Sequence, residues 1–232
     1  MSAPDLPPPA PVPFHEEAGD GLSVRGMLHA PAGGTKDGLV LTHGAGSSSD
    51  GPLLVALAEA LAARGLAVLR CDLPFRQARP HGPPSPAGAA WDLAGLRAAV
   101  EALARIGPKR VCLGGHSYGG RQASLLAAED PTVARALVLL SYPLHPPKRP
   151  GELRVTHFPR LRTPALFVHA TADPFGSVAE LRSALAGIPA PTALHLEAGV
   201  GHDLGASRRS RQALADLVAR IADRWLEFMR TR

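Results

Sequence analysis

The stretch RVCLGGHSYGGRQASLLAAED, residues 110–130, decides the fold of this chain. Its apolar start is typical of a buried strand, and its second half favours a helix. Between the two, Ser117 stands in the pattern G-x-S-x-G. A strand that turns sharply into a helix lifts such a serine above the sheet, and Gly115 and Gly119 would relieve the crowding at the turn. The stretch therefore predicts Ser117 as a nucleophile, against the alternative of a structural serine in a glycine turn.

The surrounding chain alternates segments typical of strands with segments typical of helices. The expected strands, several of which run into loops, cover residues 21–30, 38–46, 66–73, 110–117, 134–144, 164–176 and 192–202. The expected helices cover residues 47–65, 89–107, 118–130, 177–188 and 207–231. This alternation implies βαβ units and a mostly parallel sheet. We therefore predict a single α/β domain over residues 20–232, preceded by a Pro-rich tail, extended or disordered, over residues 1–19.

The composition is that of a folded protein with a basic surface. Of the 232 residues, 45% are hydrophobic, and 25 Lys and Arg against 20 Asp and Glu give a net charge of +5. No nucleic-acid-binding motif accompanies this charge, so we predict no nucleic-acid partner. No apolar run reaches the ~20 residues of a membrane-spanning helix, and the N-terminal segment does not have the pattern of a secretory signal. We therefore predict a cytoplasmic protein without a membrane partner.

The two cysteines, Cys71 and Cys112, both fall in apolar segments expected to be buried strands. The predicted sheet places a third strand between them, which keeps their α-carbons too far apart for a disulfide. Neither cysteine has the sequence spacing of a metal or redox site. The sequence predicts two buried thiols, no metal and no cofactor.

A serine nucleophile needs a base, and the base needs an orienting carboxylate. The histidines downstream of Ser117 are His145, His157, His169, His195 and His202. Of these, His202 lies in a Gly-flanked loop between the last strand and the terminal helix, where a loop-borne base belongs. Asp173 follows a buried strand, at the edge where ligand sites of such sheets gather, although an aspartate before proline is also a common turn residue. We predict His202 as the base and Asp173 as its acid.

The negative charge that develops on a carbonyl oxygen under attack needs backbone N–H donors. The Gly-rich segment THGAG, residues 42–46, follows a strand and precedes a helix, so the N–H of Ala45 could point into the site. The N–H of Tyr118, directly after the nucleophile, would be its partner. THGAG lacks the patterns of phosphate-binding loops. We therefore predict Ala45 and Tyr118 as the oxyanion hole.

Over about residues 20–231 the chain resembles the α/β-hydrolases. The resemblance is carried by LTHGAG (41–46), VLRCDLPFR (68–76), GHSYGGRQAS (115–124), LSYPLHPP (140–147), ATADPFG (170–176) and GHD (201–203). The chain is broadly similar to the dienelactone-hydrolase-like branch, although that enzyme's nucleophile is a cysteine. It resembles more closely a small group whose animal relatives include a testis-expressed protein and a subunit of the non-specific-lethal chromatin complex. The resemblance implies an α/β-hydrolase fold with every triad position filled, but no particular substrate.

Many α/β-hydrolases insert a helical cap after the strand that here ends near Ser141. This chain reaches its next strand at Pro164, which leaves too short a segment for a cap domain. We expect a shallow, open cleft bordered by this Pro-rich loop and by the loop over residues 74–88. The basic residues on the two loops, which could favour an anionic substrate or simply be solvated, are Arg76, Arg79, His145, Lys148 and Arg149.

Together these residues predict a serine hydrolase that cleaves a carboxylic ester or thioester of a small molecule through an acyl-enzyme. The alternative is a non-catalytic binding module that keeps the hydrolase shell within a larger assembly. The sequence leaves open the acyl group, the leaving group and the oligomeric state.

Overall fold

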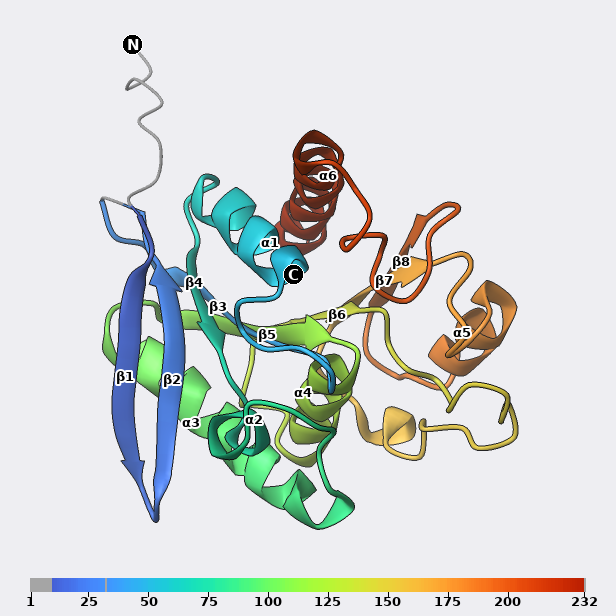
Figure 1. The fold of residues 1–232 in the computed structure, drawn as a ribbon, viewed down its shortest axis with the longest axis horizontal. Helices are drawn as coiled ribbons and strands as arrows, with labels where there is room; N and C mark the ends of the chain where they lie inside the picture. The colour runs from blue at the N-terminus through green and yellow to red at the C-terminus, as the bar shows by residue number, and fades with distance from the viewer. Residues whose placement is uncertain (1–9, 32, 232) are drawn as a thin grey trace.

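The computed structural model describes residues 10–31 and 33–231, and its centre is an eight-stranded sheet (Figure 1). The strands are β1 (Val12–Gly19), β2 (Leu22–His29), β3 (Asp37–Thr42), β4 (Ala67–Cys71), β5 (Arg110–His116), β6 (Leu137–Leu140), β7 (Ala165–Ala170) and β8 (Thr192–Glu197). The helices are α1 (Pro52–Ala62), α2 (Pro74–Ala78), α3 (Ala89–Arg105), α4 (Tyr118–Glu129), α5 (Val178–Leu185) and α6 (Arg211–Arg230), with short 3-10 helices at Pro86–Gly88 and Phe158–Arg160.

The sheet is mostly parallel, as the alternating sequence pattern predicts. Its strand order is β1-β2-β4-β3-β5-β6-β7-β8, and the strands from β4 to β8 in this order are parallel, while β2 is antiparallel to both of its neighbours. Thr42, the last residue of β3, pairs with Gly115 of β5. The loop after β3 and the turn after β5 therefore leave the sheet side by side, at the edge where ligands bind in open α/β sheets.

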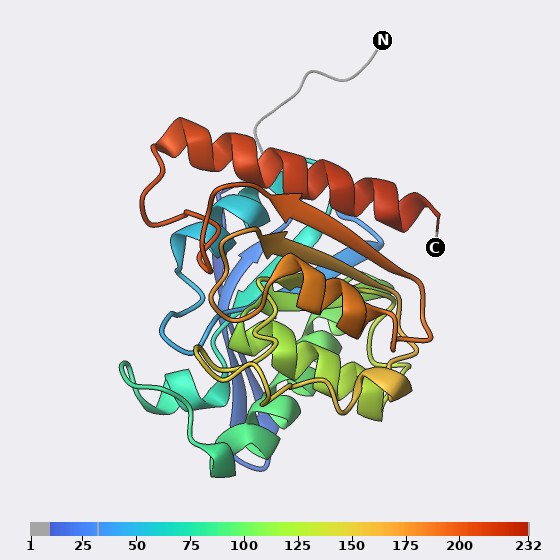
Figure 2. The same ribbon diagram turned by 90° about the vertical axis from the view of Figure 1, so that its right-hand side faces the viewer.

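Helices cover both faces of the sheet and bury its core in two layers. The core on one face includes α1 and α6, and the core on the other includes α3, α4 and α5 (Figure 1, Figure 2). In α6 the apolar residues Leu217, Ile221, Trp225 and Phe228 recur every three or four positions and are at most 5% exposed. This spacing puts them on one stripe of the helix, which explains why α6 lies along the sheet.

The N-terminal boundary of the sheet differs from the prediction. Residues 12–19, assigned to a tail, form β1, which pairs antiparallel with β2. Most of the prolines that suggested a tail precede this strand, and Pro13 is tolerated because β1 lies at the edge of the sheet. Phe14 and Ala18 pack against the core from alternate positions of the strand. The rest of the predicted tail, residues 1–9, lies outside the described residues.

Two other segments differ locally from the prediction. The loop over residues 74–88 contains α2 and a short 3-10 helix. The terminal helix begins at Arg211, not at residue 207, because the Ser210 hydroxyl accepts a hydrogen bond from the Ala213 N–H and caps it there.

The cysteines lie where the sequence predicts. Strand β3 separates Cys71 on β4 from Cys112 on β5, and both thiols are buried and unpaired. Burial raises the pKa of each thiol to about 12. Because the thiolate is the reactive form, both cysteines belong to the packed core and not to a reactive site.

The connection between β6 and β7, residues 141–164, contains only the short Phe158–Arg160 helix and forms no cap domain. Among the helices of residues 10–31 and 33–231, none is both long and apolar enough to cross a membrane.

Candidate active site

Ser117 occupies a strained turn between β5 and α4. Its φ of 52° and ψ of −113° are unfavourable for a residue with a side chain, and such strain gathers at functional sites. The two glycines around it are required by close packing. A Cβ on Gly115 would lie 2.7 Å from the Thr42 carbonyl oxygen, and one on Gly119 would lie 2.6 Å from the His43 carbonyl oxygen. The strand-to-helix turn predicted from the sequence is therefore present.

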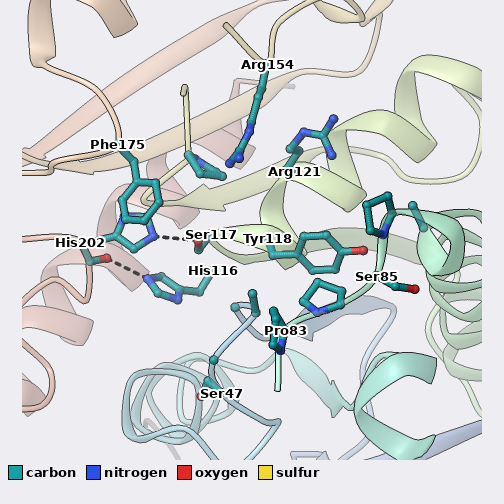
Figure 3. Close-up of a pocket in the computed structure, with 17 residues that line it drawn as sticks. Ser47, Pro83, Ser85, His116, Ser117, Tyr118, Arg121, Arg154, Phe175 and His202 are labelled. Carbon is teal, nitrogen blue, oxygen red and sulfur yellow. Dashed lines mark hydrogen bonds between the residues drawn. The ribbon is translucent and has the colours of Figure 1, made fainter. Parts of the chain in front are cut away.

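Ser117, His202 and Asp173 are brought together in one hydrogen-bonded line. The Ser117 Oγ lies 2.7 Å from Nε2 of His202 (Figure 3). Nδ1 of His202 lies 2.8 and 3.0 Å from the two carboxylate oxygens of Asp173. With the proton on Nδ1, the imidazole donates to Asp173 and accepts from the serine hydroxyl. This tautomer is the one that a general base for Ser117 requires.

Asp173 is fixed in place by the turn that follows β7. Its side chain is fully buried, and Oδ1 accepts a 2.9 Å hydrogen bond from the backbone N–H of Phe175. The Phe175 ring lies against the His202 ring, with 4.1 Å between their centres. Phe175 therefore helps to position both Asp173 and His202. The sequence analysis missed this role, because ring stacking between different loops leaves no mark in local spacing.

His116, next to Ser117, is a second residue that the sequence analysis missed. Its Nε2–H donates a 2.8 Å hydrogen bond to the backbone carbonyl oxygen of His202. Burial lowers the pKa of His116 to about 4, so the ring is neutral near pH 7. His116 thereby holds the loop that carries His202 against the end of β5.

Ala45 and Tyr118, the predicted oxyanion donors, both line the pocket beside Ser117. Tyr118 is the first residue of α4, and the first N–H groups of a helix have no acceptor inside it. The loop that carries Ala45 is held from behind by Arg76, whose Nη2 donates to the Ala45 carbonyl oxygen at 2.7 Å and whose Nε donates to that of Ser47 at 2.8 Å. Both predicted donors therefore lie within the site.

A buried network fixes the side chain of Tyr118. Its hydroxyl donates to Oδ2 of Asp92 at 2.7 Å and accepts from Nε2 of Gln122 at 2.7 Å. Asp92 also accepts a hydrogen bond from the Phe75 N–H, and burial is the main reason why the pKa of this carboxyl is raised. The network ties helices α2, α3 and α4 together beneath the pocket.

A second serine–histidine pair lies nearby. Ser124 Oγ and His157 Nε2 are 2.8 Å apart, a distance that would suit part of a triad. Both residues are almost completely buried, and the charges that act on His157 are those of Arg121 and Arg160, with no carboxylate among them. Ser124 also lies 2.8 Å from the Arg121 carbonyl oxygen. The pair therefore joins α4 to the loop after β6, and neither residue lines the pocket beside Ser117.

The pocket above Ser117 has a volume of about 650 Å³. Residues 83–86 border it on one side, and Pro143 and Arg154 belong to the loop after β6 that borders it on another. The two loops predicted to border the cleft therefore do so.

The charged lining of the pocket differs from the sequence expectation. None of the five basic residues proposed from the sequence lines it: Arg76 is turned to backbone carbonyls, Arg79 donates to the Pro83 carbonyl oxygen, and Arg149 pairs with Glu152. His145 is buried with its ring beside the Pro146 carbonyl oxygen, and Lys148 lies outside the lining. The guanidinium groups that reach the pocket are those of Arg121 and Arg154 (Figure 3).

Histidine, cysteine and carboxylate side chains do not converge into a metal site anywhere in the part of the chain that the structure describes: no group of three or more could hold an ion.

Comparison with known proteins agrees with this architecture. The dienelactone hydrolase of Anabaena variabilis superposes with a TM-score of 0.72 at 21% identity, covering 94% of this chain and 98% of that one. Est1E of Butyrivibrio proteoclasticus superposes with a TM-score of 0.73 at 19% identity, covering 94% of this chain and 98% of that one. Brefeldin A esterase, a bacterial homologue of human hormone-sensitive lipase, superposes with a TM-score of 0.72 at 20% identity, covering 100% of this chain and 81% of that one. Residues 35–230 match the family model of the alpha/beta hydrolase domain, and the chain belongs to that family.

Proposed function

We propose that the chain is a serine hydrolase that cleaves a carboxylic ester or thioester of a small molecule. One observation carries the proposal: the line from Asp173 through His202 to Ser117 has hydrogen-bond distances throughout and ends in a pocket. Nucleophile, base and orienting carboxylate in this arrangement are what acyl transfer through a serine requires. The names of two similar structures, a dienelactone hydrolase and brefeldin A esterase, support the same reaction class.

In this mechanism the Ser117 oxygen attacks the carbonyl carbon while Nε2 of His202 takes the hydroxyl proton. The carbonyl oxygen becomes negative, and the N–H groups of Ala45 and Tyr118 are the donors proposed to bind it. Collapse of the tetrahedral intermediate breaks the bond to the alcohol or thiol, which leaves with the proton from His202. Water then attacks the acyl-enzyme by the same steps and releases the acid.

The contact between His157 and Ser124 offers an alternative pair of base and serine. The geometry favours His202 with Ser117 over this pair. His202 is paired with a buried carboxylate and lines the pocket, whereas His157 lies within the core beside two arginines. The imidazolium that forms when the base takes the serine proton would be stabilised by Asp173 at His202. At His157 the same imidazolium would be disfavoured by the positive charges of the two arginines. The proposed roles therefore fall on Ser117 and His202.

The test uses a fluorophosphonate probe and a panel of p-nitrophenyl esters and acyl thioesters of varied chain length. The wild type should be labelled and should turn over part of the panel, and Ser117→Ala should lose both properties. The matched control is Ser124→Ala, which removes the histidine-bonded serine within α4 and should keep both labelling and turnover. Absence of labelling and turnover in folded wild type would refute the proposal and favour a non-catalytic binding module.

The closer resemblance, to the group with a testis-expressed protein and a chromatin-complex subunit, stays part of the proposal. It rests on the matching sequence stretches, and it names no substrate.

A further inference from the structure

Two arginine side chains lie in the pocket on the side away from the Gly44–Ser47 loop. Arg121 stands one turn beyond Ser117 on α4, where its backbone N–H donates to the Ser117 carbonyl oxygen at 2.9 Å. Arg154 comes from the loop after β6. Figure 3 shows both side chains beyond Ser117 and Tyr118, opposite Ser47 and Pro83. The pocket therefore has a positively charged wall next to the proposed nucleophile.

Neither guanidinium has a protein partner within the described residues. The Nε of Arg121 is buried without any hydrogen-bond acceptor. No hydrogen bond or ion pair of the Arg154 side chain occurs in that part of the chain, and the residues that line the pocket include no carboxylate. Burial, and then the positive charge of Arg121, lower the pKa of Arg154, while Tyr142 and Glu152, which lie outside the pocket lining, act in the opposite direction and do not cancel the shift. The two charges therefore oppose each other, with no neutralising group in the pocket lining.

The three arginines that the sequence suggested for the pocket differ from Arg121 and Arg154, because each has a partner. Arg76 donates to four carbonyl oxygens, Arg79 donates to that of Pro83, and Arg149 pairs with Glu152. An unpaired charge that is partly removed from water raises the free energy of the folded protein. Two such charges in one pocket are costly unless a bound anion compensates them.

We propose that Arg121 and Arg154 bind a carboxylate of the substrate, so that the ester or thioester attacked by Ser117 carries a second, ionised acid group. The proposal rests on the proposed hydrolase function and names its substrate class. A guanidinium is planar and presents paired N–H donors that match the two oxygens of a carboxylate. The pocket of about 650 Å³ leaves room for such a group beside the scissile bond.

The test compares charged and neutral substrates of matched size. Mono-p-nitrophenyl glutarate against p-nitrophenyl pentanoate places the carboxylate in the acyl part, and 4-acetoxybenzoate against 4-acetoxybenzamide places it in the leaving group. In one of the pairs kcat/KM for the charged member should be at least about tenfold higher, the scale of one charge-assisted hydrogen bond. Arg121→Gln and Arg154→Gln should each reduce this ratio about tenfold or more. The control Arg149→Gln removes a paired charge from the same loop and should leave the ratio unchanged.

Binding to the Ser117→Ala variant separates this proposal from the proposed reaction. Titration calorimetry would measure the binding of both substrate pairs to this variant. In the pair that the pocket accepts, the charged member, mono-p-nitrophenyl glutarate or 4-acetoxybenzoate, should bind more tightly than its neutral counterpart. Adding Arg154→Gln to Ser117→Ala should remove the difference. Arg-dependent binding without any turnover by wild type would support the subsite and overturn the hydrolase. Turnover with equal kcat/KM in both pairs, unaffected by the two Arg→Gln changes, would overturn the subsite and leave the hydrolase standing.

Discussion

The imidazole of His116 donates its Nε2–H to the backbone carbonyl oxygen of His202, 86 residues further along the chain. Ser117 directly follows His116, so the proposed nucleophile and the loop of its proposed base are attached to the same end of β5. The hydrogen bond length of 2.8 Å and the neutral state of the His116 ring fit a donor whose task is positional. The Ser117–His202 distance thus depends on a residue outside the triad.

Replacing His116 by alanine should lower kcat roughly tenfold to a hundredfold and leave KM nearly unchanged, because displacement of a catalytic group by about 1 Å has an effect of that size. Steady-state kinetics on a neutral p-nitrophenyl ester would measure both constants. His116→Gln keeps an N–H donor of similar reach and should recover part of the loss. An alanine variant with the wild-type kcat and the wild-type rate of fluorophosphonate labelling would contradict the positioning role.

The contrast between Ser117 and His116 shows what the sequence can reveal about this site. The strand-to-helix turn at Ser117 is predictable because it is a local feature: a strand, two glycines and a helix stand next to it in the chain. The role of His116 is not, because its partner is a carbonyl oxygen on a distant loop. A backbone acceptor has no side-chain identity, so no spacing rule could indicate the contact.

The arginines illustrate the same limit for the pocket. Arg76 stood in a loop that borders the site, yet its guanidinium folds back onto the Ala45 loop. Arg121 lay inside a predicted helix, where a charged residue usually faces solvent. The orientation of α4 on the sheet decides which of its side chains reach the pocket. This orientation results from packing against the sheet, and the sequence pattern alone does not determine it.

Arg76 should support catalysis through the loop that it holds. Replacement by methionine, which keeps the apolar stem, leaves the carbonyl oxygens of Ala45 and Ser47 without these donors and loosens the proposed oxyanion loop. We expect kcat to fall about tenfold or more. Complete loss of one oxyanion donor lowers kcat by a factor of ~10²–10³, and partial displacement of a donor lowers it less. Arg76→Lys supplies a single point charge and should recover only part of the lost kcat. Equal kcat in wild type and Arg76→Met would show that Arg76 does not support catalysis in this way.

Gly119→Ala tests the close approach of α4 to the end of β3. The added Cβ would lie 2.6 Å from the His43 carbonyl oxygen, which belongs to the backbone and cannot rotate away. Overpacking of this kind costs about 1–3 kcal/mol. At ~2–4 °C per kcal/mol for a chain of this size, Tm in a thermal melt should fall by several degrees. Gly151→Ala, in open space, is the control and should melt like the wild type. A Gly119→Ala variant as stable as that control would show that the turn can relax.

Acid should destabilise the fold through its buried neutral histidines. Burial lowers the pKa of His29, His116 and His157 from 6.5 to about 4. Between these values the unfolded chain binds protons that the folded chain excludes, so stability falls as the pH decreases from about 6.5 to 4. Each group contributes at most about 1.4 kcal/mol per pH unit over this window.

His157 offers the clearest measurement of this effect, because it lies outside the proposed triad. In His157→Gln the loss of the Ser124 contact should lower Tm at pH 7. The variant carries no imidazole to protonate, so its Tm should fall less steeply than that of the wild type between pH 6.5 and 4, and the two curves should converge. Parallel melting curves across this range would show that His157 is not held neutral by the core. Divergence would mean that the folded protein accepts the proton more readily than the unfolded chain, opposite to the effect expected from burial beside Arg121.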